Sequence, residues 1–192
     1  MAEPAALEAA IALQLLCPQI PLIFMGEETG NEAPFLFFTD HNENLAQAVR
    51  EGRRREFASF PQFADPALLK QIPDPNDANT FERSRPFAER ASDPRRKDLY
   101  KHLLGLRRAH IIPRLVGARA FDANTIGEGA VVARWRMGDG VILTLACNLA
   151  RTAVKIEPVV NEILFVTSDK ALKSCRVGQL EAHTTIAQLT SK

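Results

Sequence analysis

The sequence PLIFMGEE, residues 21–28, decides the interpretation of the first half of this chain. Its first five residues form a continuous apolar run, which is typical of a strand buried on both faces of a parallel sheet. Gly26 breaks the run, and the carboxylates of Glu27 and Glu28 follow at once. Since a (β/α)8 barrel places its active site at the carboxyl ends of its strands, this order predicts a barrel strand that ends in polar site residues.

Helical patterns surround this predicted strand. Apolar residues recur at helical spacing in three stretches, residues 4–16, 45–60 and 98–110. Residues 61–93 are rich in Pro, Asp and Asn and predict a long loop, in which PDPND at 73–77 can form neither helix nor strand. A single strand cannot make a sheet, because its backbone groups and both its faces need neighbours. We therefore expect residues 1–115 to be the last helix-strand-helix portion of a (β/α)8 barrel whose other strands precede this chain.

The sequence pattern changes from helical to alternating after Pro113. Short runs of strand character occur at residues 130–136, 141–146, 152–156, 163–167 and 184–189. Gly138-Asp139-Gly140, between the first two runs, is a hairpin turn signal. Short strands joined by turns are typical of an antiparallel sandwich. We therefore place a boundary near Leu115 and expect an α+β chain, with the barrel remnant at 1–115 and an antiparallel β-sandwich domain at 116–192.

Composition and charge argue against several classes of protein. The 192 residues are 46% hydrophobic and 24% charged, which is ordinary for a globular chain. A formal net charge of +1 gives no field that would attract nucleic acid or an anionic membrane, so neither is expected as a partner. The apolar stretches are too short to span a bilayer, and no basic region precedes the first of them, so no signal peptide is expected.

The three cysteines are Cys17, Cys147 and Cys175. Their odd number and their spacing argue against a disulfide framework and against a zinc site. Cys17 and Cys147 lie in apolar runs and are expected to be small buried hydrophobic residues. A reducing, cytoplasmic compartment is the simplest interpretation.

Several stretches together resemble one enzyme family. Residues 20–28 are similar to the eighth barrel strand of the α-amylase superfamily, with its Gly-Asp/Glu-Glu ending. PFLFFTDH at 34–41, with VREGRRREF at 49–57 behind it, resembles malto-oligosyltrehalose trehalohydrolase. So do PDP at 73–75 with Thr80-Phe81, and residues 180–189, which are similar to the end of that family's C-terminal β-domain. The resemblance covers nearly the whole chain and corresponds to the C-terminal part of such an enzyme.

The resemblance implies a glycoside hydrolase that cuts the α-1,4 bond next to the trehalose end of maltooligosyl trehalose, with no cofactor and no metal. Such enzymes use a nucleophilic carboxylate and a carboxylic acid about 5 Å apart. In this superfamily those groups lie on strands four and five, with a third Asp after strand seven, and all three positions would precede Met1. We therefore expect no catalytic residue in this chain and no activity of the chain alone. The implied partners are maltooligosyl trehalose or a related α-glucan, and the missing barrel portion.

Two positions depart from the family pattern. Thr29 stands where the family carries an aromatic residue, so a sugar-stacking platform is missing there. Arg85-Pro86-Phe87 replaces the family's Lys-Leu-x-Trp pattern in the long loop. Both departures concern substrate recognition.

Four polar residues are candidates for sugar binding: Glu27, Glu28, Asp40 and His41. Adjacent residues on an extended chain point apart, so Glu27 and Glu28 are poorly placed as an acid and nucleophile pair. One of them could bond sugar hydroxyls or hold its loop, but a structural pairing with a nearby Arg or backbone amide is favoured. Asp40 and His41 follow an apolar run near the expected barrel mouth, but a turn or helix-capping role is favoured over sugar binding, because Asp before Asn42 and Leu45 suits the start of a helix. His41 and Glu43 lack a third ligand at suitable spacing, so no metal is expected.

The aromatic residues leave two interpretations open. Phe35, Phe37 and Phe38 could stack on a sugar, although alternating aromatics more often belong to a core. Trp135 lies in an alternating strand, which favours a sandwich core over carbohydrate stacking.

Two hypotheses of different classes therefore stand. The chain is either the end of a trehalose-releasing hydrolase, or a non-catalytic carbohydrate-binding or structural module that docks on a separate barrel. The coding DNA upstream of Met1 would distinguish them, since only the first requires the rest of the barrel in the same frame.

Overall fold

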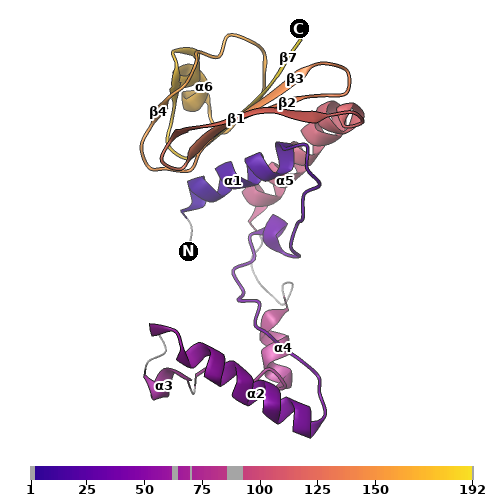
Figure 1. Cartoon of the computed structure of the whole chain (residues 1–192), viewed down its shortest axis with the longest axis vertical. Helices are drawn as coiled ribbons and strands as arrows, with labels where there is room; N and C mark the ends of the chain where they lie inside the picture. The colour runs from indigo at the N-terminus through magenta and orange to yellow at the C-terminus, as the bar shows by residue number, and fades with distance from the viewer. Residues whose placement is uncertain (1–2, 62–64, 70, 86–92, 192) are drawn as a thin grey trace. The chain divides into compact units, whose positions relative to one another are not determined.

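The computed structural model describes residues 3–61, 65–69, 71–85 and 93–191 (Figure 1). The chain forms two compact units. The first, called here the sheet unit, contains Met1–Ile23 and Lys97–Lys192, and the second, the aromatic unit, contains Phe24–Arg96. This grouping differs from the expected boundary near Leu115, because helices from before that boundary share a core with the sheet.

The sheet unit is built around one antiparallel sheet in the strand order β1-β2-β3-β7-β5. Its strands are β1 (Arg119–Gly127), β2 (Ala130–Arg136), β3 (Ile142–Asn148), β5 (Ile163–Val166) and β7 (Thr184–Thr190). A two-stranded pair, β4 (Val154–Lys155) with β6 (Gln179–Leu180), and the helix α6 (Asp169–Arg176) complete the C-terminal part. The antiparallel arrangement is confirmed, but the expected sandwich is one five-stranded sheet with a short additional pair.

The turn between β2 and β3 forms where the sequence predicted a hairpin. Gly140 donates its amide to the Met137 carbonyl at 2.9 Å, and Met137 donates to the Val141 carbonyl at 2.8 Å. Gly140 has a φ of 87°, a left-handed conformation that favours glycine. The turn fixes the register of the two strands, so that Trp135 lies opposite Leu143.

One face of the sheet is covered by α1 (Pro4–Leu16) and α5 (Pro94–Leu106), as Figure 1 shows. Leu15 and Leu103 on these helices and Leu145 on β3 are fully buried in one cluster. The Thr185 hydroxyl of β7 also donates to the Ala9 carbonyl of α1 at 2.7 Å. The sequence-based division at residue 115 separated these helices from the sheet, because hydrophobic periodicity shows that a face is buried without showing which partner buries it.

The other face of the sheet carries a second, smaller cluster. Ala146 of β3 and Ile186 of β7 pack there with Cys175 of α6 and Leu180 of β6. Successive side chains on β3 and β7 therefore enter the two clusters alternately, as the period of two requires. Neither α6 nor β6 was predicted from the sequence, and the edge strand β1 was missed because most of its residues are exposed.

A single arginine ties the end of α1 to the helix that follows α5. Helix α5 continues directly into a π-helical turn, η3 (Arg107–Ile111), which is followed by a 3-10 turn, η4 (Ile112–Arg114). The buried Arg107 guanidinium donates to the carbonyl oxygens of Leu15 at 3.0 Å and Gln19 at 2.7 Å, and to those of Cys17 and Pro18 between them. Burial lowers the pKa of this guanidinium. It satisfies carbonyls at the end of α1 that have no partner within the helix.

The expected barrel strand at residues 21–25 is not formed within the described part of the chain. These residues belong to no sheet, Met25 lies in a turn, and Leu22 is 86% exposed. A strand requires a neighbour that pairs with its backbone, and none of the five described strands of the main sheet pairs with these residues. The predicted barrel strand is therefore not confirmed, because the apolar run forms an irregular segment in this structure.

The aromatic unit consists of short helices joined by extended segments. They are the 3-10 turn η1 (Glu27–Thr29), α2 (Glu43–Ala58), α3 (Pro66–Leu69) and α4 (Ala78–Ser84). The expected long loop at 61–93 thus contains two helices, and α4 starts where the Asp77 carboxylate accepts from the Asn79 amide at 2.8 Å. PDPND at 73–77 forms neither helix nor strand, as predicted. Within the described ranges, no helix has the length and apolar character needed to cross a membrane.

Candidate functional site

Three of the stretches that carry the family resemblance meet inside the aromatic unit. Thr39 donates its amide to the Pro75 carbonyl at 2.7 Å and its hydroxyl to Asn76 Oδ1 at 3.1 Å. Arg50 Nε pairs with Asp74 Oδ2 at 2.7 Å. Segments 34–41, 49–57 and 73–81 are therefore fastened to one another, although they are separate in the sequence.

Asp74 takes part in several of the hydrogen bonds that join these segments. Its backbone carbonyl accepts the Thr80 hydroxyl at 2.7 Å, and its carboxylate accepts the Asn76 amide at 3.1 Å. Burial opposes ionisation of the carboxyl, but the hydrogen bonds from Asn76 and Arg50 outweigh it and lower its pKa. The ionised form of Asp74 is therefore part of the folded arrangement at neutral pH.

Four phenylalanines form a chain of edge-to-face contacts. Ring centroids are 4.8 Å apart for Phe24 and Phe35, 5.6 Å for Phe35 and Phe38, and 5.1 Å for Phe38 and Phe81. Such T-shaped pairs are the preferred geometry of aromatic contacts. Phe38 is partly buried between its two neighbours, whereas Phe35 remains 50% exposed. The aromatic run therefore supplies both packing and an accessible ring.

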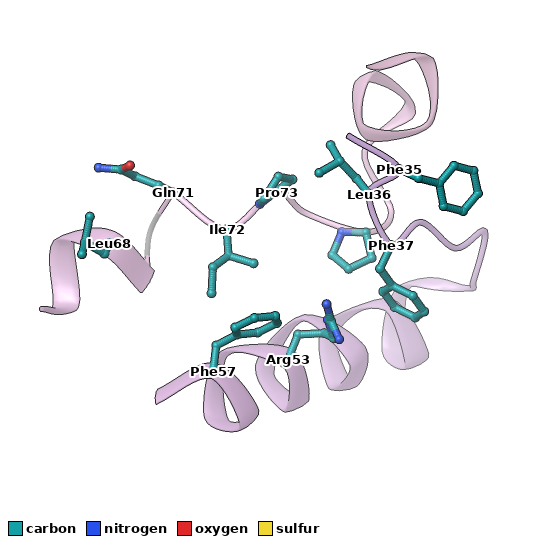
Figure 2. A pocket seen from close by; sticks show the side chains of 10 residues that line it. Phe35, Leu36, Phe37, Arg53, Phe57, Leu68, Gln71, Ile72 and Pro73 are labelled. Atoms are coloured by element: carbon teal, nitrogen blue, oxygen red, sulfur yellow. The ribbon is translucent and has the colours of Figure 1, made fainter. Parts of the chain in front are cut away.

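A hollow of about 420 Å³ in the aromatic unit, called here the larger hollow, lies beside these rings (Figure 2). Ten residues line it: Phe35, Leu36, Phe37, Arg53, Phe57, Leu68, Gln71, Ile72, Pro73 and Pro75. The Arg53 guanidinium carbon lies 4.7 Å from the ring centroids of both Phe37 and Phe57. Figure 2 shows Arg53 and Phe57 rising from α2 on one side, with Ile72 directed toward them from the opposite side.

This hollow has the chemistry of a site for a small, mostly neutral ligand with an apolar face. Phe37 is 49% exposed, so one ring is open to stacking. The Arg53 guanidinium is held between two rings and by Glu56 Oε2 at 3.3 Å, with further N–H groups that can donate to hydroxyls. Pockets that bind small molecules combine apolar walls with a few polar groups in this way.

A smaller hollow, of about 170 Å³, lies at the end of the apolar run. It is lined by Phe24, Met25, Gly26, Glu27, Asn31, Ala33, Phe35 and Ser84. Gly26 has a φ of 90° and turns the chain into η1. Glu28 Oε2 accepts the Gly26 amide at 3.0 Å, so this carboxylate holds its own turn, while the neighbouring Glu27 lines the hollow.

Thr29, one of the two departures from the family pattern, belongs to the same turn. Its hydroxyl donates to the Gly26 carbonyl at 2.9 Å, so it stabilises the turn instead of offering a stacking surface. Of the other departure, Arg85 is exposed and pairs with Glu82 at 2.8 Å. Residues 86 and 87 lie outside the described ranges.

Asp40 and His41 are exposed at the start of α2 and line neither hollow. The helix start predicted here is confirmed, but the residue that caps it is Asn42, whose Oδ1 accepts the Leu45 amide at 3.1 Å. Among the described residues, no group of three His, Cys, Asp or Glu side chains is arranged to hold a metal ion. Of the four predicted sugar-binding residues, Glu27 alone lines one of these hollows.

Sequence reasoning did not select Arg53 and Phe57 as site residues. Their spacing of four on α2 places them on one helical face, which was a usable signal. The missing information was that Phe37, sixteen residues earlier, reaches the same face. Trp135 packs against the cluster formed by the sheet and helices, so its expected place in the core is confirmed.

Comparisons with known proteins agree with the resemblance. A family model described as a domain of unknown function, DUF3459, matches residues 118–184. Two proteins named malto-oligosyltrehalose trehalohydrolase, from Brevibacterium helvolum and Rhizobium sp. (strain M-11), are 34% and 37% identical to the chain. Each match covers 85% of this chain, and 27% and 26% of the relative, respectively. The chain thus spans about a quarter of the length of these relatives.

Solved structures give the same result. A putative α-amylase from Salmonella typhimurium superposes with a TM-score of 0.75 at 32% identity, over 97% of this chain and 31% of that one. A trehalulose synthase mutant, MutB R284C, superposes with a TM-score of 0.59 at 17% identity, which shows a likeness of fold alone. The resemblance to the C-terminal part of a malto-oligosyltrehalose trehalohydrolase, stated from the sequence motifs, is confirmed.

Proposed function

Because the chain is related along 85% of its length to malto-oligosyltrehalose trehalohydrolases, we propose that it acts as the C-terminal portion of a trehalose-releasing glycoside hydrolase. The reaction would be hydrolysis of the α-1,4 bond next to the trehalose end of maltooligosyl trehalose. This activity belongs to the complete enzyme, of which the chain supplies about a quarter of the length.

The observation that carries the proposal is the joining of the family motifs into one structure. Segment 34–41 is bonded to 73–77 through Thr39, and 49–57 is bonded to the same turn through Arg50. These contacts position Phe35 and Phe37 beside Arg53 at the edge of an open hollow. An arrangement of motifs around a pocket supports a role in holding substrate more than a role in packing alone.

We assign roles to the residues as substrate contacts and supports, and none as a catalyst. Phe35 and Phe37 offer rings to the apolar face of a pyranose, while Arg53 and Glu27 offer a donor and an acceptor to its hydroxyls. Glu28 supports the turn that carries Glu27. Asp40 and His41 remain predicted sugar-binding residues, at the exposed start of α2.

The isolated chain is proposed to be inactive toward maltooligosyl trehalose. Retaining glycosidases need two carboxyl groups about 5 Å apart, on either side of the scissile bond. Glu28 is engaged by the Gly26 amide, and among the described residues that line the hollow of about 170 Å³ the one carboxylate is that of Glu27. A chain with this arrangement holds part of a substrate without cutting it.

A chimaera tests the proposal directly. The corresponding segment of the Rhizobium relative, 37% identical, is replaced by this chain, and trehalose released from maltooligosyl trehalose is measured. We expect trehalose release by the chimaera and none by the chain alone. A folded chimaera without activity would contradict the proposed function and favour a separate module that docks on a barrel. Turnover by the isolated chain that is lost in Glu27→Gln would contradict the assignment of no catalytic residue.

A further inference from the structure

The two hollows of the aromatic unit have one lining residue in common, Phe35. It lines the larger hollow together with Phe37 and Arg53, and it lines the smaller hollow together with Glu27 and Asn31. Figure 2 shows the Phe35 ring at the edge of the larger hollow, directed away from Arg53. The two hollows therefore adjoin at Phe35.

Two T-shaped contacts hold the Phe35 ring in place. Its centroid lies 4.8 Å from that of Phe24 and 5.6 Å from that of Phe38. Such contacts restrict the ring, although Phe35 itself is half exposed. Because the ring is already ordered, little further side-chain freedom is lost when a ligand packs against it.

The two hollows differ in the size of ligand that they can hold. The smaller measures about 170 Å³ and the larger about 420 Å³. Pockets for drug-sized ligands measure about 300–1,000 Å³. The smaller hollow lies below this range and has room for one monosaccharide unit, whereas the larger has room for more than one. The volumes therefore suit the end of a sugar chain in the smaller hollow and the units that follow it in the larger hollow.

Asn31 supplies a free hydrogen-bond donor to the smaller hollow. Its Oδ1 atom accepts the Ala33 amide at 3.1 Å, and its backbone amide donates to the Gly26 carbonyl at 3.0 Å, so the residue is fixed at both ends. Its Nδ2 atom donates to no described residue, and it is not one of the buried unpaired atoms. The carboxamide oxygen is thus engaged, while the solvent-accessible N–H groups are available to a hydroxyl of a molecule in this hollow.

The other polar side chains of the smaller hollow complement this donor. The Ser84 hydroxyl donates to the Thr80 carbonyl at 2.8 Å and accepts the Leu36 amide at 3.0 Å, so it serves the fold. The Glu27 carboxylate is an acceptor, whereas the Asn31 amide is a donor. A donor and an acceptor beside aromatic walls match the hydroxyl groups and the apolar face of a sugar ring.

We propose that the two hollows are successive subsites for one α-1,4-glucan chain, divided by the Phe35 ring. The terminal glucose unit lies in the smaller hollow, where Asn31 Nδ2 donates to one of its hydroxyls. The choice of an α-glucan rests on the proposed function, whereas the order of the subsites rests on the two volumes and the shared ring. Asn31 is thereby a residue that determines specificity for the chain end.

The test uses the full chain labelled with ¹⁵N and titrated separately with glucose and with maltotriose. Glucose should give saturable shifts of the Asn31 side-chain amide and of the Gly26 backbone amide, both at the smaller hollow. Maltotriose should shift these signals and also the amides of residues that line the larger hollow, and it should bind more tightly than glucose.

Three variants separate the two subsites. Asn31→Asp keeps an oxygen for the Ala33 amide but removes the donor, so the affinity for both sugars should fall about threefold to tenfold, the value of one hydrogen bond. Phe37→Ala removes a ring that lines the larger hollow alone, so it should weaken maltotriose binding and leave glucose binding unchanged. Asn44→Asp, an exposed change on α2 that lines neither hollow, is the matched control and should alter neither affinity. The thermal midpoint of each variant checks that it is folded.

Several outcomes would overturn the divided site. They are an unchanged glucose affinity in folded Asn31→Asp, an equal loss of glucose and maltotriose binding in Phe37→Ala, or no saturable shift with either sugar at tens of millimolar. Shifts confined to the larger hollow would contradict the subsite for the chain end and leave the proposed function standing. An inactive chimaera together with the expected shifts would contradict the proposed function alone, because the titrations use this chain by itself.

Discussion

The two units of this chain use their hydrophobic residues in opposite ways. In the sheet unit, leucines of α1, α5 and β3 are fully buried in one cluster. Among the described residues of the aromatic unit, Ala46 is the only hydrophobic residue that is buried. Phe35, Phe37 and Phe81 are about half exposed. Large exposed apolar side chains that gather around a hollow are typical of binding surfaces. On this comparison the sheet unit supplies stability, and the proposed function assigns recognition of substrate to the aromatic unit.

The largest expected effect concerns the core of the sheet unit. Leu103→Ala removes a fully buried side chain from the cluster between helices and sheet, and should lower the free energy of unfolding by about 2–5 kcal/mol. Leu68→Ala, at a side chain that lines the larger hollow and is 38% exposed, should cost much less. Urea denaturation followed by circular dichroism measures both. Equal losses of unfolding free energy in the two variants would contradict the claim that stability comes mainly from the sheet unit.

Arg107 gives the next largest effect. Arg107→Met leaves four carbonyl groups at the end of α1 without their donor, and should destabilise the chain by about 1–3 kcal/mol. Arg108→Met, at the exposed neighbouring position, is the matched control and should have little effect. The thermal midpoints of the two variants provide the measurement. An unchanged thermal midpoint in Arg107→Met would mean that the segment after α1 is held by other contacts.

The aromatic unit should respond in binding more than in stability. Phe37→Ala removes one of the two rings beside the Arg53 guanidinium, a contact of about 0.5–1 kcal/mol at an exposed site. In the active chimaera it should raise KM several-fold while the urea midpoint changes little. Phe60→Ala, which removes a half-exposed ring that does not line the hollow, should leave KM unchanged. A KM insensitive to Phe37 would contradict the assignment of this hollow to substrate.

The smallest effect is a dependence on pH. The folded-state pKa of Asp74 lies below its ordinary value of 3.8, so its stabilising contribution is present above that value and is lost as the pH falls below it. Because the pair with Arg50 is partly exposed, the contribution should be about 1 kcal/mol or less. Arg50→Met should raise the pKa of Asp74 in an NMR titration, since the hydrogen bond and the positive charge of the Arg50 guanidinium are both lost. An unchanged pKa would show that the Asn76 amide suffices.

Sequence patterns predicted elements better than they predicted neighbours. Residues 4–16 and 130–136 form the helix and the strand that their periodicity indicates. The helix at 4–16, however, packs against a sheet whose strands come more than a hundred residues later in the sequence, as the hydrogen bond from the Thr185 hydroxyl to the Ala9 carbonyl shows. Local periodicity carries no information on such a partner, and the same limit applies to the strand predicted at 21–25, which is not confirmed.

The candidate site was predictable in part for a similar reason. Gly26, where the sequence showed the apolar run to break, lies in a turn beside a hollow, and Glu27 lines that hollow. The larger hollow depends on Phe37 meeting Arg53 across two segments, which no spacing within either segment reveals. Asp40 and His41 were chosen from their position after an apolar run, yet the structure places them at an exposed helix start.

Native-state hydrogen exchange tests the comparison between the two units most directly. If α1 belongs to the core of the sheet unit, the amides of Leu15 and Leu16 should exchange only through global unfolding, at the same free energy as Leu145 of β3. The amides of α2, from Val49 to Phe57, should exchange at a much lower free energy. Exchange of Leu15 and Leu16 together with α2, while Leu145 stays protected, would contradict this account and restore a boundary near Leu115.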